Sequence, residues 1–209
     1  MLKVLQIFLL SAMIIVFAVG CNSENSDNDE IAFITVNADS EYENTFQDLG
    51  IGIVFDFNLK LPNADNSWVD IWVEGYSDGK AIEPFPIRQL SYGLSPNQEE
   101  EGPMGFGIIN PSSTEPQLFL YSQGTSNTPR SIGNNFWDEF GISDWDYAIG
   151  SDTIGIESGE ERILAVYLQN EESMRIAYEY QNTDSVNQMI EENKTVLLFK
   201  IKVEESRLK

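Results

Sequence analysis

The sequence predicts one all-β domain over residues 31–206, built as a single antiparallel β-sandwich. Apolar and polar residues alternate over long stretches, the other apolar segments are short and bounded by turn-forming residues, and helix signals are few. About 176 residues are enough for one well-buried core. We therefore expect an immunoglobulin-like general architecture, with a β-barrel as the alternative.

The clearest alternation lies in GIGIVFDFNLKL, residues 50–61, where apolar residues hold every second position from Ile51 to Leu61. Alternate side chains of a strand point to the same face, so this stretch predicts a long half-buried strand. SWVDIWVEGY, residues 67–76, repeats the pattern. The segment between them is rich in Pro, Asn and Asp, which favour turns. The two strands are therefore expected to form a hairpin or meander.

The other strand candidates are short, rich in β-branched or aromatic residues, and bounded by Gly, Pro, Ser or Asn. They span residues 31–36, 86–92, 104–110, 117–123, 153–157, 162–169, 175–180 and 195–204. In RILAVYLQ, Ile163, Ala165 and Tyr167 are expected on one face, and Leu164, Val166 and Leu168 on the other. Apolar residues on both faces predict a central, covered strand.

One short helix is expected near residues 185–193, because Ser185 and Gln188 have the spacing of a capping box. NNFWDEFG, residues 134–141, could add one or two helical turns. Two long polar loops are expected at residues 95–103 and 123–135, and loops of this length either carry function or tolerate insertions.

The first twenty residues have the pattern of a secretory signal peptide. Lys3 is the only charged residue, residues 4–19 are almost entirely apolar, and small residues precede Cys21. Sixteen apolar positions are short for a permanent membrane span, which needs about 20. The sequence therefore predicts a signal peptide over residues 1–20, a disordered acidic spacer over residues 21–30, the domain over residues 31–206 and a tail over residues 207–209.

Ala18-Val19-Gly20-Cys21 resembles the lipobox of bacterial lipoproteins. The resemblance implies that the chain is cut before Cys21 and that its sulfur receives a diacylglyceryl group. Two acyl chains anchor a protein stably to a bilayer, whereas one does not. The expected location is the extracytoplasmic face of a bacterial cell envelope. The alternative is an ordinary secretory signal followed by an incidental cysteine.

The chain is strongly acidic, with 34 Asp and Glu residues against 12 Lys and Arg residues and a net charge of −22. Such a charge disfavours nucleic acid as a partner, because nucleic acids are bound mainly through their phosphates. It also disfavours direct docking on anionic headgroups. A lipid on Cys21 is therefore the expected contact with the membrane. Residues 22–30 would act as a spacer that holds the acidic domain at most about 30 Å from the anchor.

The residue inventory excludes several kinds of catalysis. The chain has no histidine, and its single cysteine is assigned to lipidation. Histidine-dependent triads, thiol nucleophiles and metal sites built on His or Cys are therefore excluded. No phosphate-binding glycine loop and no nucleophile elbow is present. We therefore do not expect an enzyme, although a hydrolase using two carboxylates remains open.

Calcium is the one cofactor that stays open, because it takes oxygen ligands. Asp27–Glu30 and Ser143–Asp152 contain clustered acids, but neither follows the EF-hand order. The alternative interpretation is that these are solvated surface acids. A calcium- or solute-binding envelope lipoprotein is therefore the second function considered.

Aromatic and acidic residues are densest in FWDEFGISDWDY, residues 136–147. Aromatic rings beside carboxylates suit a sugar face or a protein partner. The candidate ligand-binding residues are Trp137, Phe140, Asp144, Trp145, Asp146 and Tyr147. The alternative is that these aromatics fold inward as a plug over one end of the sandwich. The leading function is a lipid-anchored binding or interaction module for a protein or a glycan.

Overall fold

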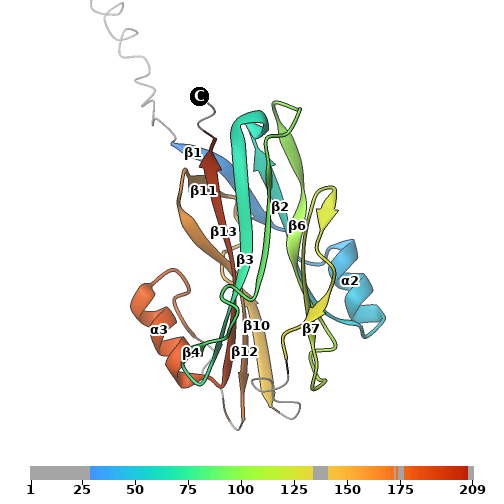
Figure 1. The fold of residues 1–209 in the computed structure, drawn as a ribbon, viewed down its shortest axis with the longest axis vertical. Coiled ribbons are helices and arrows are strands. Elements are labelled where there is room, and N and C mark those ends of the chain that lie inside the picture. Colours follow the sequence, from blue (N-terminus) through green and yellow to red (C-terminus); the bar gives the residue numbers. More distant parts are fainter. Residues whose placement is uncertain (1–28, 134–140, 172, 174–176, 207–209) are drawn as a thin grey trace, which may run out of the picture.

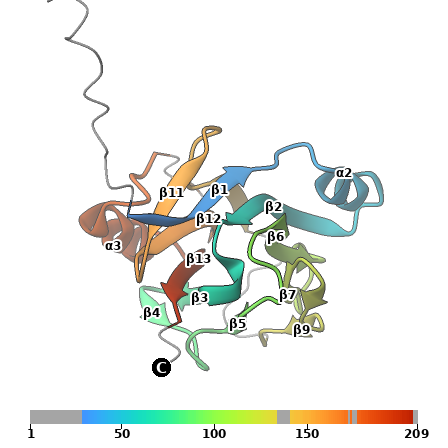
Figure 2. The ribbon, with the colours of Figure 1, turned by 90° about the horizontal axis from the view of Figure 1, so that it is seen from above.

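Two antiparallel sheets pack face to face in a computed structural model that describes residues 29–133, 141–171, 173 and 177–206. The view from above separates the two layers (Figure 2). Their strand orders are β11-β1-β2-β6-β7-β8 in sheet A and β10-β12-β13-β3-β4 in sheet B, with β9 and β5 pairing β7 and β3. The predicted all-β sandwich is therefore confirmed.

Sheet A contains β1 (Glu30–Val36), β2 (Gly52–Leu61), β6 (Glu100–Ile109), β7 (Gln117–Ser122), β8 (Thr125–Ser126), β9 (Arg130–Ser131) and β11 (Ile154–Glu157). Sheet B contains β3 (Ser67–Ser77), β4 (Lys80–Ala81), β5 (Arg88–Gly93), β10 (Ile142–Tyr147), β12 (Glu161–Asn170) and β13 (Thr195–Glu205). The described residues include the helices α2 (Glu41–Asp48) and α3 (Thr183–Glu192), which lie on opposite sides of the sandwich (Figure 1).

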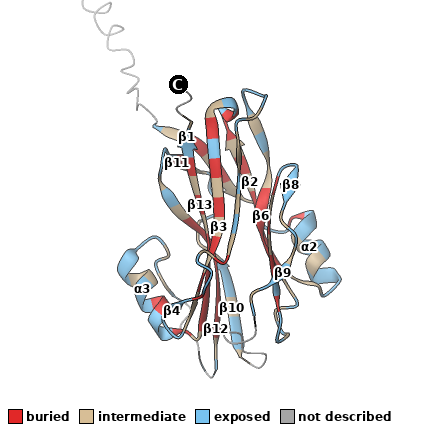
Figure 3. Ribbon diagram, viewed as in Figure 1, coloured by how far each residue is buried: buried red, intermediate tan, exposed pale blue. Residues whose placement is uncertain are grey.

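The core fills the space between the sheets, as the buried strands in Figure 3 show. Phe55 and Phe57 of β2 contribute from sheet A, and Phe199 of β13 contributes from sheet B. The rings of Phe57 and Phe199 are 5.9 Å apart between centroids. The alternation in residues 50–61 therefore identified the inward face of β2 correctly.

The prediction that β2 and β3 form a hairpin is wrong. β2 pairs β1 and β6 in sheet A, whereas β3 pairs β13 in sheet B. The connection includes a 3-10 turn at Ala64–Asn66, and Ala64 is buried. The loop therefore carries the chain from one sheet to the other.

β12 is the covered central strand that its composition predicts, between β10 and β13. The assignment of its first residues to faces is wrong, because a bulge lies between Ile163 and Ala165. Leu164, Ala165 and Tyr167 enter the core between the sheets. Ile163, Val166 and Leu168 instead form a second cluster with Met189 and Ile190 of α3. A bulge adds one residue and so changes the alternation.

The predicted helix near 185–193 is confirmed as α3, but its cap is Asn182 and not Ser185. The Asn182 side chain accepts hydrogen bonds from the backbone N–H groups of Asp184 and Ser185. The Ser185 hydroxyl accepts one from the N–H of Glu179. The first turn of α3 thus begins one turn before the predicted capping box.

Helix α2 is absent from the sequence prediction. Ser40 caps it by accepting a hydrogen bond from the N–H of Glu43, and none of its own residues is buried. It lies over the outer face of β2, where Val54 and Asp56 are buried. β2 is therefore covered on both faces over this stretch, and not half-buried as expected.

Three other segments differ from expectation. β6 begins at Glu100, inside the stretch predicted as a loop over residues 95–103. Residues 177–180, expected as the end of a strand, are not in one. β10 occupies residues 142–147, where no strand was expected. Within the described ranges, neither helix has the length or hydrophobicity needed to cross a membrane.

β1 begins at the end of the sandwich where β13 finishes. Glu30 pairs with Glu157, and the nearby Gly159 N–H donates to the carbonyl of Val203. The start of β2 and the turn after β6 lie at the opposite end, because Gly52 pairs with Ile109. Cys21 and the rest of residues 1–28 lie outside the described residues.

Candidate functional site

Four of the six predicted ligand-binding residues lie on β10, an edge strand of sheet B; Trp137 and Phe140 lie outside the described residues. Trp145 pairs with Tyr167, and Tyr147 pairs with Ala165. Because opposed residues share a face, Trp145 and Tyr147 lie on the side of sheet A. Asp144 and Asp146 lie on the outer face. The structure thus separates the rings from the carboxylates.

Tyr147 is folded into the sandwich, as the plug interpretation expects. Its ring makes edge contacts with Phe55 and Phe57, at 5.5 and 5.2 Å between centroids. Its hydroxyl accepts a hydrogen bond from the N–H of Asp56 at 3.2 Å and donates to Glu43 of α2 at 3.3 Å. Burial is the main reason that the pKa of Tyr147 is raised. Tyr147 therefore connects β10, β2 and α2.

Asp56 is the centre of this connection, although its place in the alternation predicts solvent exposure. It is 1% exposed. Its carboxylate accepts hydrogen bonds from the Tyr121 hydroxyl and the Asn37 amide, both at 2.7 Å. Burial and then the hydrogen bond to Asp56 raise the pKa of Tyr121. Burying a polar group is costly unless it is hydrogen-bonded, and these two bonds offset part of that cost.

Trp145 has the opposite environment, although it is only two residues from Tyr147. It is 49% exposed. It forms one wall of a groove of about 620 Å³ at the end of the sandwich remote from the start of β1. The other walls come from α2 and the turn after β6. The polar and aromatic lining residues are Phe46, Gln47, Asn110, Ser112, Ser113, Ser143 and Trp145.

The Trp145 groove is connected to the core through Ser143. Ser143 lies on the same face of β10 as Trp145 and interacts with the Tyr167 hydroxyl. Burial raises the pKa of Tyr167 to about 12, and the neighbouring Ser143 side chain partly opposes that shift. The β10 wall of the groove is held to the central strand β12 by their antiparallel pairing.

A second hollow of about 560 Å³ lies on the other side of Phe46, over the outer face of sheet A. Tyr42 of α2 and Phe119 and Tyr121 of β7 supply its rings. Thr125 and Ser126 of β8, together with Ser122 and Asn127, supply its small polar lining residues. Phe46 lines both hollows. We call the two hollows together with Phe46 the α2 surface. Phe46 is the aromatic residue that the two hollows share.

Within the described ranges, no Asp, Glu, Lys or Arg lines either hollow. The two candidate acids of β10 lie elsewhere, and Asp146 accepts a hydrogen bond from Tyr180 at 3.3 Å. Burial, followed by Asp146, raises the pKa of Tyr180 to about 12. In the described part of the chain, no group of three or more acidic residues is arranged to hold a metal ion.

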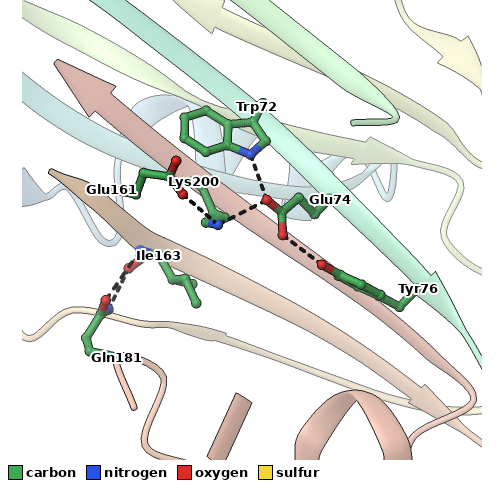
Figure 4. A network of polar contacts seen from close by, with 7 residues as sticks. All are labelled: Trp72, Glu74, Tyr76, Glu161, Ile163, Gln181 and Lys200. Atoms are coloured by element: carbon green, nitrogen blue, oxygen red, sulfur yellow. Dashed lines mark hydrogen bonds and ion pairs between the residues drawn. The ribbon is translucent and has the colours of Figure 1, made fainter. Parts of the chain in front are cut away.

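The outer face of sheet B carries charged residues that pair with one another (Figure 4). Lys200 contacts Glu74 at 3.0 Å and Glu161 at 3.1 Å, and its Nζ lies 5.4 Å from the Trp72 ring centroid. Glu74 also accepts hydrogen bonds from the Trp72 indole and the Tyr76 hydroxyl. We call these five residues the Lys200 network.

The Lys200 network brings two carboxylates together, but their arrangement is that of an ion-pair network. A hydrolytic pair of acids flanks the bond that is cleaved. Here the Lys200 ammonium lies between Glu74 and Glu161 and bonds to both. The adjoining hollow of about 280 Å³ is lined by both acids and by Trp72, Phe85 and Lys202.

Sequence reasoning found Trp145 but missed Phe46, Tyr42 and the rings of β7. These residues belong to a surface that exists only because α2 lies on sheet A. A usable signal was present, since Ser40 and Glu43 have the spacing of a helix start. The helix they begin is short, and Tyr42 and Phe46 are the two aromatic residues among its eight.

Comparison with known proteins places this chain through one family model. The model of the YgaN domain matches residues 40–203, from the cap of α2 to the end of β13. No curated protein and no solved structure matches the chain. The matched region includes α2, β10 and both hollows. The chain belongs to the YgaN domain family.

Proposed function

We propose that this protein is a lipid-anchored binding module on the extracytoplasmic face of a bacterial cell envelope, with the Trp145 groove as its ligand site. The observation that carries the proposal is the contrast within β10. Tyr147 is fixed by two ring contacts and two hydrogen bonds, whereas Trp145 exposes half of its surface in the wall of a groove. The ligand is a protein or a glycan.

The position of the groove supports an anchored module. The lipobox-like residues precede β1, and β1 begins at the end of the sandwich opposite the groove. The ten residues of β2 run between the two ends and span about 30 Å. An anchor at Cys21 would therefore leave the groove directed away from the bilayer. Aromatic side chains in such hollows contribute strongly to recognition.

The anchor is tested by mass spectrometry of the mature N-terminus from cells that express the full-length protein. The expected result is a chain that begins at Cys21 and carries a diacylglyceryl group. Cys21→Ser should abolish the modification and release the protein from membranes. A mature protein with an unmodified Cys21 thiol, or one cleaved elsewhere, would refute the anchor.

The site is tested by the retention of purified full-length protein on isolated envelopes, with the anchor held in detergent micelles. Trp145→Ala should lower retention by about tenfold or more, as expected for an aromatic anchor of an interface. Trp68→Ala is the matched control. Trp68 of β3 is also a partly exposed tryptophan, at 37%, but it lies on the outer face of sheet B, whereas Trp145 lies on the face toward sheet A. Equal retention of both variants would contradict the assignment of the groove.

A further inference from the structure

We propose that the whole α2 surface, and not the Trp145 groove alone, binds an uncharged oligosaccharide that lies across Phe46. This inference rests on the proposed binding function and names its ligand class. It requires that the two hollows act as one site. It also requires that the ligand carry hydroxyl groups and apolar faces but no net charge.

The charge of the lining is the first argument. The chain carries 34 acidic and 12 basic residues among 209. Among the residues that the structure describes, none of the acidic or basic ones lines either hollow. An anionic ligand would find no cation there and would meet the repulsion of a net charge of −22. A cationic ligand would find no carboxylate partner among the described lining residues. Charge complementarity therefore favours a neutral ligand.

The aromatic residues are the second argument, because they form a connected series. The ring centroids of Phe46 and Phe119 are 5.8 Å apart, those of Phe119 and Tyr121 are 6.1 Å apart, and those of Tyr121 and Tyr42 are 5.6 Å apart. Trp145 stands on the far side of Phe46. The faces of aromatic rings are electron-rich and attract the polarised C–H groups on a sugar face.

Two glycines hold part of this series in place. A Cβ on Gly107 would overlap the ring of Phe119, and a Cβ on Gly105 would overlap that of Tyr121. The rings of β7 therefore lie directly against the backbone of β6. The Tyr121 hydroxyl is further fixed by its hydrogen bond to Asp56. A site whose rings are held before binding loses less entropy when the ligand arrives.

The polar lining is the third argument. Between the rings lie neutral donors and acceptors, such as Gln47, Ser112, Thr125 and Ser126, all of them exposed. Amide and hydroxyl groups can both donate and accept hydrogen bonds, as sugar hydroxyls do. The two volumes of about 620 and 560 Å³ are each within the range of roughly 300–1,000 Å³ typical of ligand sites. A ligand that fills both must be elongated.

The experiment uses an array of immobilised uncharged oligosaccharides, namely glucans, mannans, galactans and N-acetylglucosamine oligomers, together with uronic acid oligomers. Full-length protein in detergent should bind at least one uncharged class and none of the uronic acids. Phe46→Ala should weaken that binding by about tenfold or more, because it removes the residue shared by both hollows. Trp145→Ala, which affects one hollow, should weaken it less.

The matched control is Leu49→Ala, at a residue of the same helix end that is 68% exposed and lines neither hollow. It should bind like the wild type. Melting temperatures of all variants show whether Phe46→Ala has unfolded the domain; if it has, the conservative Phe46→Leu is measured in its place and should also bind less.

The proposal is overturned if no uncharged oligosaccharide binds, if uronic acids bind equally well, or if the Phe46 variant binds like Leu49→Ala. The outcome for the proposed function is separate. If Trp145→Ala still lowers retention on envelopes while the array shows no binding, the binding module stands and its ligand is a protein.

Discussion

Trp145 and Trp72 are both partly exposed tryptophans of sheet B, but their surroundings differ. The Trp72 indole donates to Glu74, and its ring lies beneath the Lys200 ammonium. Trp145 lies in the wall of a groove whose described lining residues carry no charge. The Lys200 network satisfies its own polar groups, so its expected contribution is to stability. The α2 surface leaves rings and neutral polar groups exposed, so its expected contribution is to binding.

Tyr147 gives the largest expected effect on stability. Tyr147→Ala leaves a cavity beside Phe55 and Phe57 and removes the acceptor of the Asp56 N–H. We expect a loss of about 3 kcal/mol or more in the free energy of unfolding, measured by urea denaturation. Tyr147→Phe keeps the ring and should lose about 1–2 kcal/mol. Similar losses for both variants would mean that the hydroxyl contacts, and not the packing of the ring, hold β10.

The Lys200 network should give the next largest effect. Lys200→Met leaves Glu74, whose side chain is 13% exposed, without its cation. We expect a loss of about 2 kcal/mol in the free energy of unfolding, because an uncompensated charge in a poorly solvated site is costly. Lys200→Arg preserves the charge and should lose less. Retention on envelopes should be unchanged in both variants, and a loss of retention would place part of the binding site on this face.

Alkaline pH should give a smaller effect that is graded with pH. Burial raises the pKa of Tyr167 to about 12 and raises those of Tyr121 and Tyr147 as well. The unfolded chain loses these protons near pH 10. Stability is therefore complete below about pH 10 and falls as the pH rises toward the folded values.

Melting temperatures measured from about pH 8 to about pH 11 check this expectation. Tyr147→Phe removes one of the titrating groups and should reduce the fall in melting temperature between these limits. A fall of the same size in the variant would show that Tyr147 does not contribute to the alkaline sensitivity.

The parts of the fold that could be predicted from the sequence are those with strong local patterns. Residues 50–61 alternate apolar and polar side chains, and most of them form β2. Residues 195–204 begin with an apolar run, continue with alternation, and lie in β13. Pairing was not predictable in the same way. β2 and β3 are neighbours in sequence with a turn-rich connection, and nothing local distinguishes a hairpin from a crossing between sheets.

The candidate site was only half predictable, for a related reason. Three of the six residues 142–147 are polar, a composition that suits an edge strand. The pattern of a buried strand is therefore missing from this segment. Trp145 and Tyr147 share one face of β10, so alternation alone gives them the same environment. Their difference comes from α2 and β2, which cover Tyr147 and leave a groove at Trp145.

The most direct test measures both binding and stability for Trp145→Ala and Trp72→Ala. Trp145→Ala should lose envelope retention by about tenfold or more while its free energy of unfolding changes by less than about 1 kcal/mol. Trp72→Ala should lose about 2 kcal/mol of stability, through its bonds to Glu74 and Lys200, with retention unchanged. Loss of stability without loss of retention in Trp145→Ala would contradict the assignment of the groove as the ligand site.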